Sequence, residues 1–167
     1  MLIPGVEAFS RNRGPILSSD FRKSGLQLKK DERGKCAPMR SRILFISGRH
    51  DDARQLSRML GSLPLALEHV ETYQQARTKL QQCDYDVLLT EAALPDASWL
   101  DVLHLAREIP CDLEVIVTDP QADARFWAEA LNLGAYDVVS QPFYAPEVRR
   151  ILSNACSRPD YQYRAAV

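Results

Sequence analysis

Short apolar runs that alternate with amphipathic segments are the feature that most constrains how this chain can fold. The first run, residues 43–46, is apolar at every position, which is typical of a strand buried on both faces of a parallel sheet. The runs are too short to be independent helices, and Gly, Pro or polar residues separate them. The five runs span residues 43–46, 65–70, 86–90, 113–118 and 136–139.

Amphipathic helices are predicted after each run. After the first run the apolar residues fall at i, i+3, i+4 and i+7, at Leu56, Met59, Leu60 and Leu63. This spacing places them on one face of a helix, and Asp51 is expected to cap it. Thr72 is expected to cap the second helix, which continues through Gln82. The third helix carries Leu100, Val102, Leu103 and Ile109.

The last two helices have clear boundary signals. The fourth is predicted from Asp123 to Leu133 and is stopped by Gly134. Its apolar stripe is expected at Phe126, Ala130 and Leu133. Pro146 opens the fifth at a first-turn position that suits proline. Its apolar residues are Val148, Ile151, Leu152 and Ala155.

Five strands alternating with five helices predict an α/β fold with a doubly wound, five-stranded parallel sheet between two helical layers. In such a (βα)5 sandwich, ligands bind outside the carboxyl ends of the strands. We expect the folded domain to span residues 41–157 and residues 158–167 to form a loose tail.

Residues 1–40 show no apolar period and are expected to form a disordered arm. The arm is basic, because residues 1–42 carry ten lysines and arginines against four acids, whereas the remainder carries eleven against eighteen. Such an arm could solubilise the protein, contact its acidic part or associate weakly with nucleic acid, and solubilisation is the favoured role. An alternative is that translation begins at Met39.

The four cysteines are widely spaced, without metal-ligand offsets, at Cys36, Cys83, Cys111 and Cys156. This pattern predicts reduced thiols and a cytoplasmic protein, with Cys156 and Cys111 as small core residues. The sequence contains neither a long apolar stretch nor a secretory signal, so we expect no contact with a membrane.

Glu91 closes the third apolar run, and Leu94-Pro95-Asp96 follows shortly after it. Together with the run ending at Thr118 and the segment 134–143, this corner resembles the receiver domain of response regulators, over residues 41–157. The resemblance implies a flavodoxin-like fold and a role in two-component or phosphorelay signalling. In the family, an Asp at the position of Glu91 accepts a phosphoryl group.

The resemblance also implies that most of the phosphorylation site is missing. Ser47 and Gly48 stand where two acids bind Mg²⁺, and Gln141 stands where a Lys contacts the phosphoryl oxygens. Thr118 matches the family pattern. A phosphoryl group in transfer needs a metal and an ammonium to neutralise its charge. We therefore expect Glu91 to remain unphosphorylated, with no metal or cofactor.

Two alternatives remain at this site. A shifted loop could bring Asp51 or Asp52 towards Glu91, with His50 as a further ligand, and rebuild an acidic, phosphorylatable pocket. Otherwise Asp51 and Asp52 complement the helix dipole. Glu91 could be a solvated acid, or it could stand in for a phosphorylated acceptor and draw Thr118 inward.

The expected function is that of a stand-alone, degenerate receiver that acts through protein contact and is not an enzyme. A histidine kinase or a separate effector would dock on a face around Trp127, Val138 and Tyr144, and a homodimer through this face is compatible with the sequence. A small flavodoxin-like enzyme or nucleotide binder is the rival, but the sequence lacks a glycine-rich phosphate loop.

Overall fold

The computed structural model describes residues 40–82 and 84–157. The predictions for the basic arm, for the C-terminal tail and for Cys36 and Cys83 concern residues outside these ranges.

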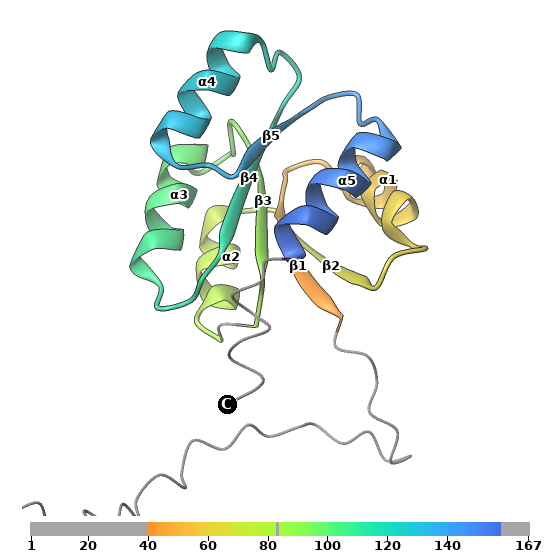
Figure 1. Ribbon diagram of the computed structural model, residues 1–167. Coiled ribbons are helices and arrows are strands. Elements are labelled where there is room, and N and C mark those ends of the chain that lie inside the picture. The colour runs from red at the N-terminus through yellow and green to blue at the C-terminus, as the bar shows by residue number, and fades with distance from the viewer. Residues whose placement is uncertain (1–39, 83, 158–167) are drawn as a thin grey trace, which may run out of the picture. The chain divides into compact units, whose positions relative to one another are not determined.

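Five parallel strands form one sheet in the order β2-β1-β3-β4-β5 (Figure 1). The strands are β1 (Ser41–Ile46), β2 (Leu65–Val70), β3 (Val87–Glu91), β4 (Glu114–Asp119) and β5 (Asp137–Ser140). Strand order reverses after β2, as a doubly wound sheet requires. The predicted fold class is therefore confirmed, and each predicted strand lies within two residues of its observed bounds.

Five helices cover the sheet. They are α1 (His50–Leu60), α2 (Tyr73–Leu80), α3 (Trp99–Glu108), α4 (Ala124–Leu133) and α5 (Ala145–Cys156). Helices α1 and α5 pack on one face, and α2, α3 and α4 lie on the other (Figure 1). None of the helices in the described part of the chain has the length and apolarity needed to cross a membrane.

Successive strand residues point to opposite faces, and this alternation gives the protein two cores. Phe45 and Leu89 face α1 and α5, whereas Leu44 and Leu88 face α2, α3 and α4. All four side chains are at most 1% exposed. Because both faces of these strands are buried, residues 43–46 of β1 and 87–89 of β3 are apolar at consecutive positions rather than at alternate ones.

One predicted N-terminal cap is confirmed and one is wrong. The Thr72 hydroxyl accepts a hydrogen bond from a backbone amide in the first turn of α2, as expected. Asp123, predicted as the first residue of the fourth helix, is instead the N-cap of α4, and its carboxylate accepts from the Phe126 amide. Asp51 does not cap α1, since the helix already begins at His50 and the N-cap position is Arg49. The Arg49 amide donates instead to the buried hydroxyl of Ser47, at 2.9 Å.

Two further expectations need correction. Leu133 does not lie on the buried stripe of α4, because it is 41% exposed. It is the last residue of the helix, where its position no longer faces the sheet. Cys111 is disulfide-bonded, so the prediction of a reduced thiol was wrong there, whereas Cys156 is free and half-buried. Sequence spacing does not reveal which cysteines lie within bonding distance in a fold.

An ionic network is centred on Glu68 of β2. Glu68 accepts hydrogen bonds from Tyr85, at 2.6 Å, and from Lys79 and Arg42, at 2.6 and 3.2 Å. The bonds from Lys79 and then Tyr85 hold the pKa of Glu68 below its usual value of 4.5. Ionised Glu68 therefore stabilises the fold above pH 4.5, and this contribution is lost as the pH falls through the lowered pKa.

Two glycines provide a matched test of the backbone. Gly134 ends α4 in the left-handed region (φ 102°), and a Cβ there would meet the Arg107 guanidinium at 2.5 Å. Gly61 ends α1 with φ −59°, and a Cβ there would make only ordinary contacts at 3.6 Å. We expect Gly134→Ala to lower the free energy of unfolding by about 1–2 kcal/mol. We expect Gly61→Ala to raise it by about 0.4–1 kcal/mol, and urea titrations of both would check this. Equal effects would contradict the assigned conformations.

Candidate functional site at the carboxyl edge of the sheet

The residues singled out in the sequence come together at one edge of the sheet. Ser47 directly follows β1, Glu91 is the last residue of β3, and Gln141 directly follows β5. Thr118 of β4 lies beside Glu91 in the parallel register. This edge is where a doubly wound sheet binds ligands, so the fold places the four side chains where site chemistry would be found.

The Glu91 carboxylate is held by the neutral hydroxyl of Ser47. Ser47 Oγ donates to Glu91 Oε1 at 2.8 Å and accepts from the Arg49 amide. The Ser47 side chain is fully buried, and its carbonyl oxygen lies 2.8 Å from the His69 ring nitrogen. Because these contacts fix Ser47 on three sides, the carboxylate of Glu91 is tied to the end of β1.

Gln141 is the polar group on the other side of the site. Its amide nitrogen donates to Asp52 Oδ2 at 3.3 Å and lies 3.5 Å from Thr118 Oγ1. The Gln141 backbone amide donates to the carbonyl of Asp119, and the peptide bond to Pro142 is cis. Gln141 therefore bridges α1 and β4 with a side chain that carries no charge.

The loop after β3 closes the site against β1. A Cβ on Gly48 would lie 3.5 Å from Pro95 Cγ, which is an ordinary contact, so a side chain fits at this position. Asp96 does not reach the site. Its two carboxylate oxygens accept from the amides of Tyr73 and Gln74 and so cap α2.

The alternative in which Asp51 or Asp52, with His50, forms an acidic pocket around Glu91 is not observed. His50 pairs with Glu71 at 2.9 Å, and Asp51 pairs with Arg54 at 3.4 Å. Asp52 reaches Gln141 rather than Glu91. Within residues 40–82 and 84–157, no three His, Cys, Asp or Glu side chains lie together in a way that could hold a metal ion.

Ser47→Ala tests the hydrogen bond that holds Glu91. The change leaves the carboxylate and the Arg49 amide without their partner, and Glu91 is half-buried. We therefore expect the free energy of unfolding to fall by about 1–2 kcal/mol. Ser57→Ala, at an exposed position of α1, is the matched control and should change it by less than about 0.5 kcal/mol. Equal effects in chemical denaturation would show that the Ser47 bond contributes nothing.

The predicted contact face is only partly exposed. Trp127 is 47% exposed and Tyr144 is 65% exposed, whereas Val138 is 5% exposed and belongs to the core. Val138 therefore does not extend the exposed surface, because its position on β5 points inward. As expected for neighbours on a helix, Phe126 packs against the core while Trp127 does not.

The family model of the response regulator receiver domain matches residues 43–153. The chain belongs to this family, whose members are modules of two-component signalling.

Known proteins support the same assignment. The chain is 24% identical over 116 residues to the response regulator protein PilR of Pseudomonas aeruginosa. That match covers 70% of this chain and 26% of PilR, so the chain spans about a quarter of that relative's length.

Two solved structures share the fold. The signal receiver domain of an HD domain-containing protein from Pseudomonas fluorescens Pf-5 has a TM-score of 0.65 at 22% identity, covering 78% of this chain and 94% of that one. The beryllofluoride-activated NtrC4 receiver domain dimer has a TM-score of 0.64 at 20% identity, covering 69% and 95%.

Proposed function

We propose that the protein is a degenerate receiver domain that acts in two-component signalling by protein–protein contact, without phosphorylation. One observation carries this proposal: the carboxylate at the acceptor position is held by the neutral hydroxyl of Ser47, 2.8 Å away. In the family pattern, an acid occupies that position and helps to bind Mg²⁺. Gln141 likewise occupies the position of the family's Lys.

Phosphoryl transfer to this site lacks countercharge. Catalysis of the transfer depends on positioning and on neutralising the charge of the phosphoryl oxygens. Mg²⁺ in such sites is bound through carboxylates, and Ser47 and Gly48 supply none. The side chain of Glu91 is also one carbon longer than that of Asp. A misplacement of about 1 Å can cost roughly a hundredfold in rate.

Glu91 is better explained as a fixed structural carboxylate than as a mimic of the phosphorylated acceptor. Its partner is Ser47, whereas the Thr118 hydroxyl lies near the Gln141 amide. A mimic would engage Thr118, because that residue contacts the phosphoryl oxygens in the family pattern. The arrangement supports a surface that is set by the fold rather than switched at Glu91.

The proposed contact face is formed by α4, β5 and α5. Its exposed aromatic residues are Trp127 and Tyr144, and such side chains are common anchors at interfaces. A histidine kinase or a separate effector in the cytoplasm is the proposed partner. A homodimer is compatible with this face, and the similar beryllofluoride-activated NtrC4 receiver domain is a dimer.

Intact-mass spectrometry tests the absence of phosphorylation. The full chain is incubated with acetyl phosphate and Mg²⁺, and a phosphorylatable receiver domain is treated in parallel as the positive control. We expect the mass of this protein to stay unchanged while the control gains a phosphoryl group. A stoichiometric gain that disappears in Glu91→Ala would overturn the proposal.

A further inference from the structure

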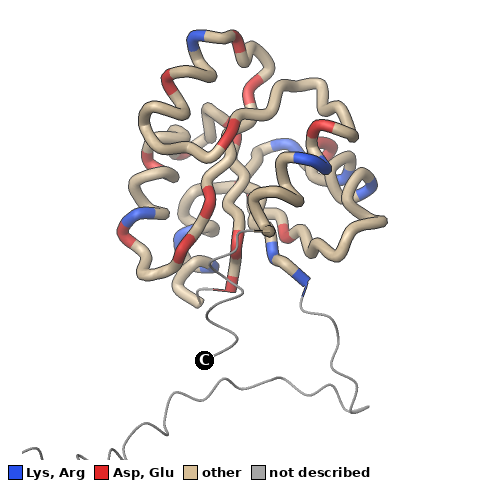
Figure 2. The backbone as a smooth tube through the Cα atoms, in the orientation of Figure 1, with Lys and Arg blue, Asp and Glu red and all other residues tan. Residues whose placement is uncertain are grey.

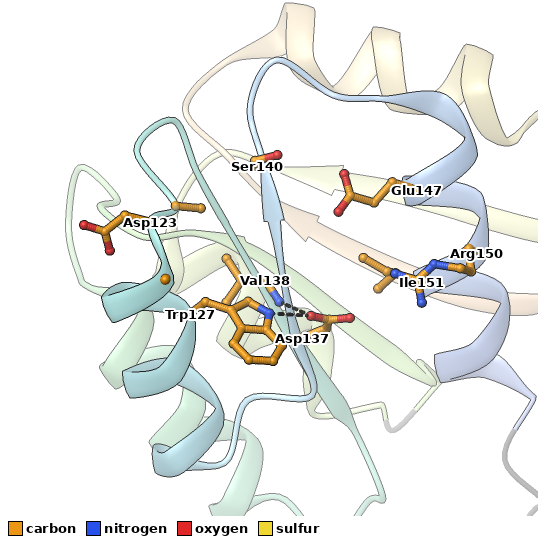
Figure 3. A pocket seen from close by; sticks show the side chains of 10 residues that line it. Asp123, Trp127, Asp137, Val138, Ser140, Glu147, Arg150 and Ile151 are labelled. Carbon is orange, nitrogen blue, oxygen red and sulfur yellow. Dashed lines mark hydrogen bonds between the residues drawn. The ribbon is translucent and has the colours of Figure 1, made fainter.

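A groove of about 500 Å³ lies between α4, β5 and α5 (Figure 3). Trp127 and Asp137 form one side of it, and Glu147 and Arg150 of α5 form the other. Val138 and Ile151 line its floor, although both are core residues that are only 5% and 1% exposed. The groove is not lined by any of the four site residues, Ser47, Glu91, Thr118 and Gln141.

Trp127 is held in a fixed position although it is 47% exposed. Its indole Nε1 donates to Asp137 Oδ1 at 3.1 Å, and the Val138 amide donates to the same oxygen at 2.8 Å (Figure 3). Because the bond to Asp137 already restricts the rotation of the indole ring, a partner that binds the ring does not have to restrict it. The entropic cost of binding is therefore lower. Asp137 Oδ2 makes no hydrogen bond within the described part of the chain.

The groove combines this aromatic surface with an excess of negative charge. Three acids line it, Asp123, Asp137 and Glu147, against one cation, Arg150. Glu147 and Arg150 form no ion pair with each other or with another described residue. Figure 2 shows acidic positions on β5 and at the start of α5.

We propose that this groove binds the guanidinium group of an arginine in a basic segment of the partner protein. This inference rests on the proposed function of the protein in protein–protein contact. A guanidinium is planar, so it stacks on an indole face and donates hydrogen bonds sideways to carboxylates. Trp127 supplies the face, and Asp137 and Glu147 supply the acceptors. An apolar partner would leave these carboxylates desolvated, and an acidic partner would be repelled.

A peptide titration of the full chain tests this specificity. The probe is a capped peptide of alternating arginine and glycine, and its control has citrulline in place of arginine, which keeps the shape and removes the charge. Proton–nitrogen NMR follows the Trp127 indole signal, assigned by its loss in Trp127→Phe, and the Val138 amide. We expect the arginine peptide to shift both signals and the citrulline peptide to bind at least about tenfold more weakly.

Variants separate the groove from general attraction to an acidic protein. Trp127→Ala and Asp137→Asn should each lower the affinity for the arginine peptide by about tenfold. The shift of the Val138 amide signal measures this affinity. Glu129→Gln removes an acid from the exposed side of α4 outside the groove, and it should leave the affinity unchanged. Circular dichroism of each variant checks that the fold is intact.

Two results would overturn the inference. One is equal binding of the citrulline and arginine peptides. The other is a concentration-dependent dimer that requires Trp127 and excludes the peptide, since the occupant would then be a second copy of the chain. Neither result affects the mass measurement on Glu91, so the proposed absence of phosphorylation would stand or fall separately.

Discussion

The quadruple variant S47D/G48D/E91D/Q141K is expected to take up one phosphoryl group from acetyl phosphate in the presence of Mg²⁺. The four changes return the two acids, the shorter acceptor and the ammonium of the family pattern. The backbone already places positions 47, 91 and 141 at one edge of the sheet, and Thr118 is in place. Position 48 accepts a side chain, because a Cβ there lies 3.5 Å from Pro95 Cγ.

The expected change is from no detectable phosphorylation to a stoichiometric gain, because under the proposal charge neutralisation is the missing component. Intact-mass spectrometry measures it. The matched control carries Ser47→Asp, Gly48→Asp and Gln141→Lys together with Glu91→Ala, and it should gain nothing because it lacks the acceptor. A folded quadruple variant that binds Mg²⁺ but remains unmodified would show that something other than these four residues prevents the transfer.

Phe45→Ala should lower the free energy of unfolding by about 3–5 kcal/mol. Phe45 is fully buried on the interior strand β1, in the core beneath α1 and α5, and the centroid of its ring lies 5.8 Å from that of His69. Removing the ring leaves a cavity that close-packed neighbours fill only in part. Urea denaturation followed by circular dichroism measures the loss.

Leu133→Ala is the control for Phe45→Ala, because Leu133 is a large apolar residue that is 41% exposed on α4. We expect it to change the free energy of unfolding by less than about 0.5 kcal/mol. A loss at Phe45 no larger than that at Leu133 would contradict the assignment of β1 to the buried centre of the sheet.

The sequence predicted the fold because its signals are local. The run 43–46 is apolar at every position, as expected for a strand covered on both faces, and its length and the polar residues beside it favour a strand over a helix. Thr72, Asp123 and Gly134 were recognised as helix boundaries because capping depends on neighbours in the chain. Leu133 was misplaced because helical spacing does not indicate where a helix leaves the core.

The sequence predicted where the site residues lie but not which hydrogen bonds they form. Strand order brought Glu91, Thr118 and Gln141 to one edge, as the sequence pattern indicated. The bonds from Ser47 to Glu91 and from Gln141 to Asp52 depend on loop conformations that join residues 44 and 89 positions apart. The hydroxyl of Ser47, directly after β1, is the one sequence signal for the first of these bonds, but comparison with the family pattern indicates only that an acid is missing there.

Fluorine NMR of the unmodified protein with Mg²⁺ and beryllium fluoride tests the central claim most directly. A beryllofluoride adduct at the acceptor position requires the acceptor carboxylate, the metal ion and the countercharge at the same time. We expect only the signals of free fluoride species, and in the same conditions S47D/G48D/E91D/Q141K should show a bound signal. A bound beryllofluoride signal in the unmodified protein that is lost in Glu91→Ala would contradict the account.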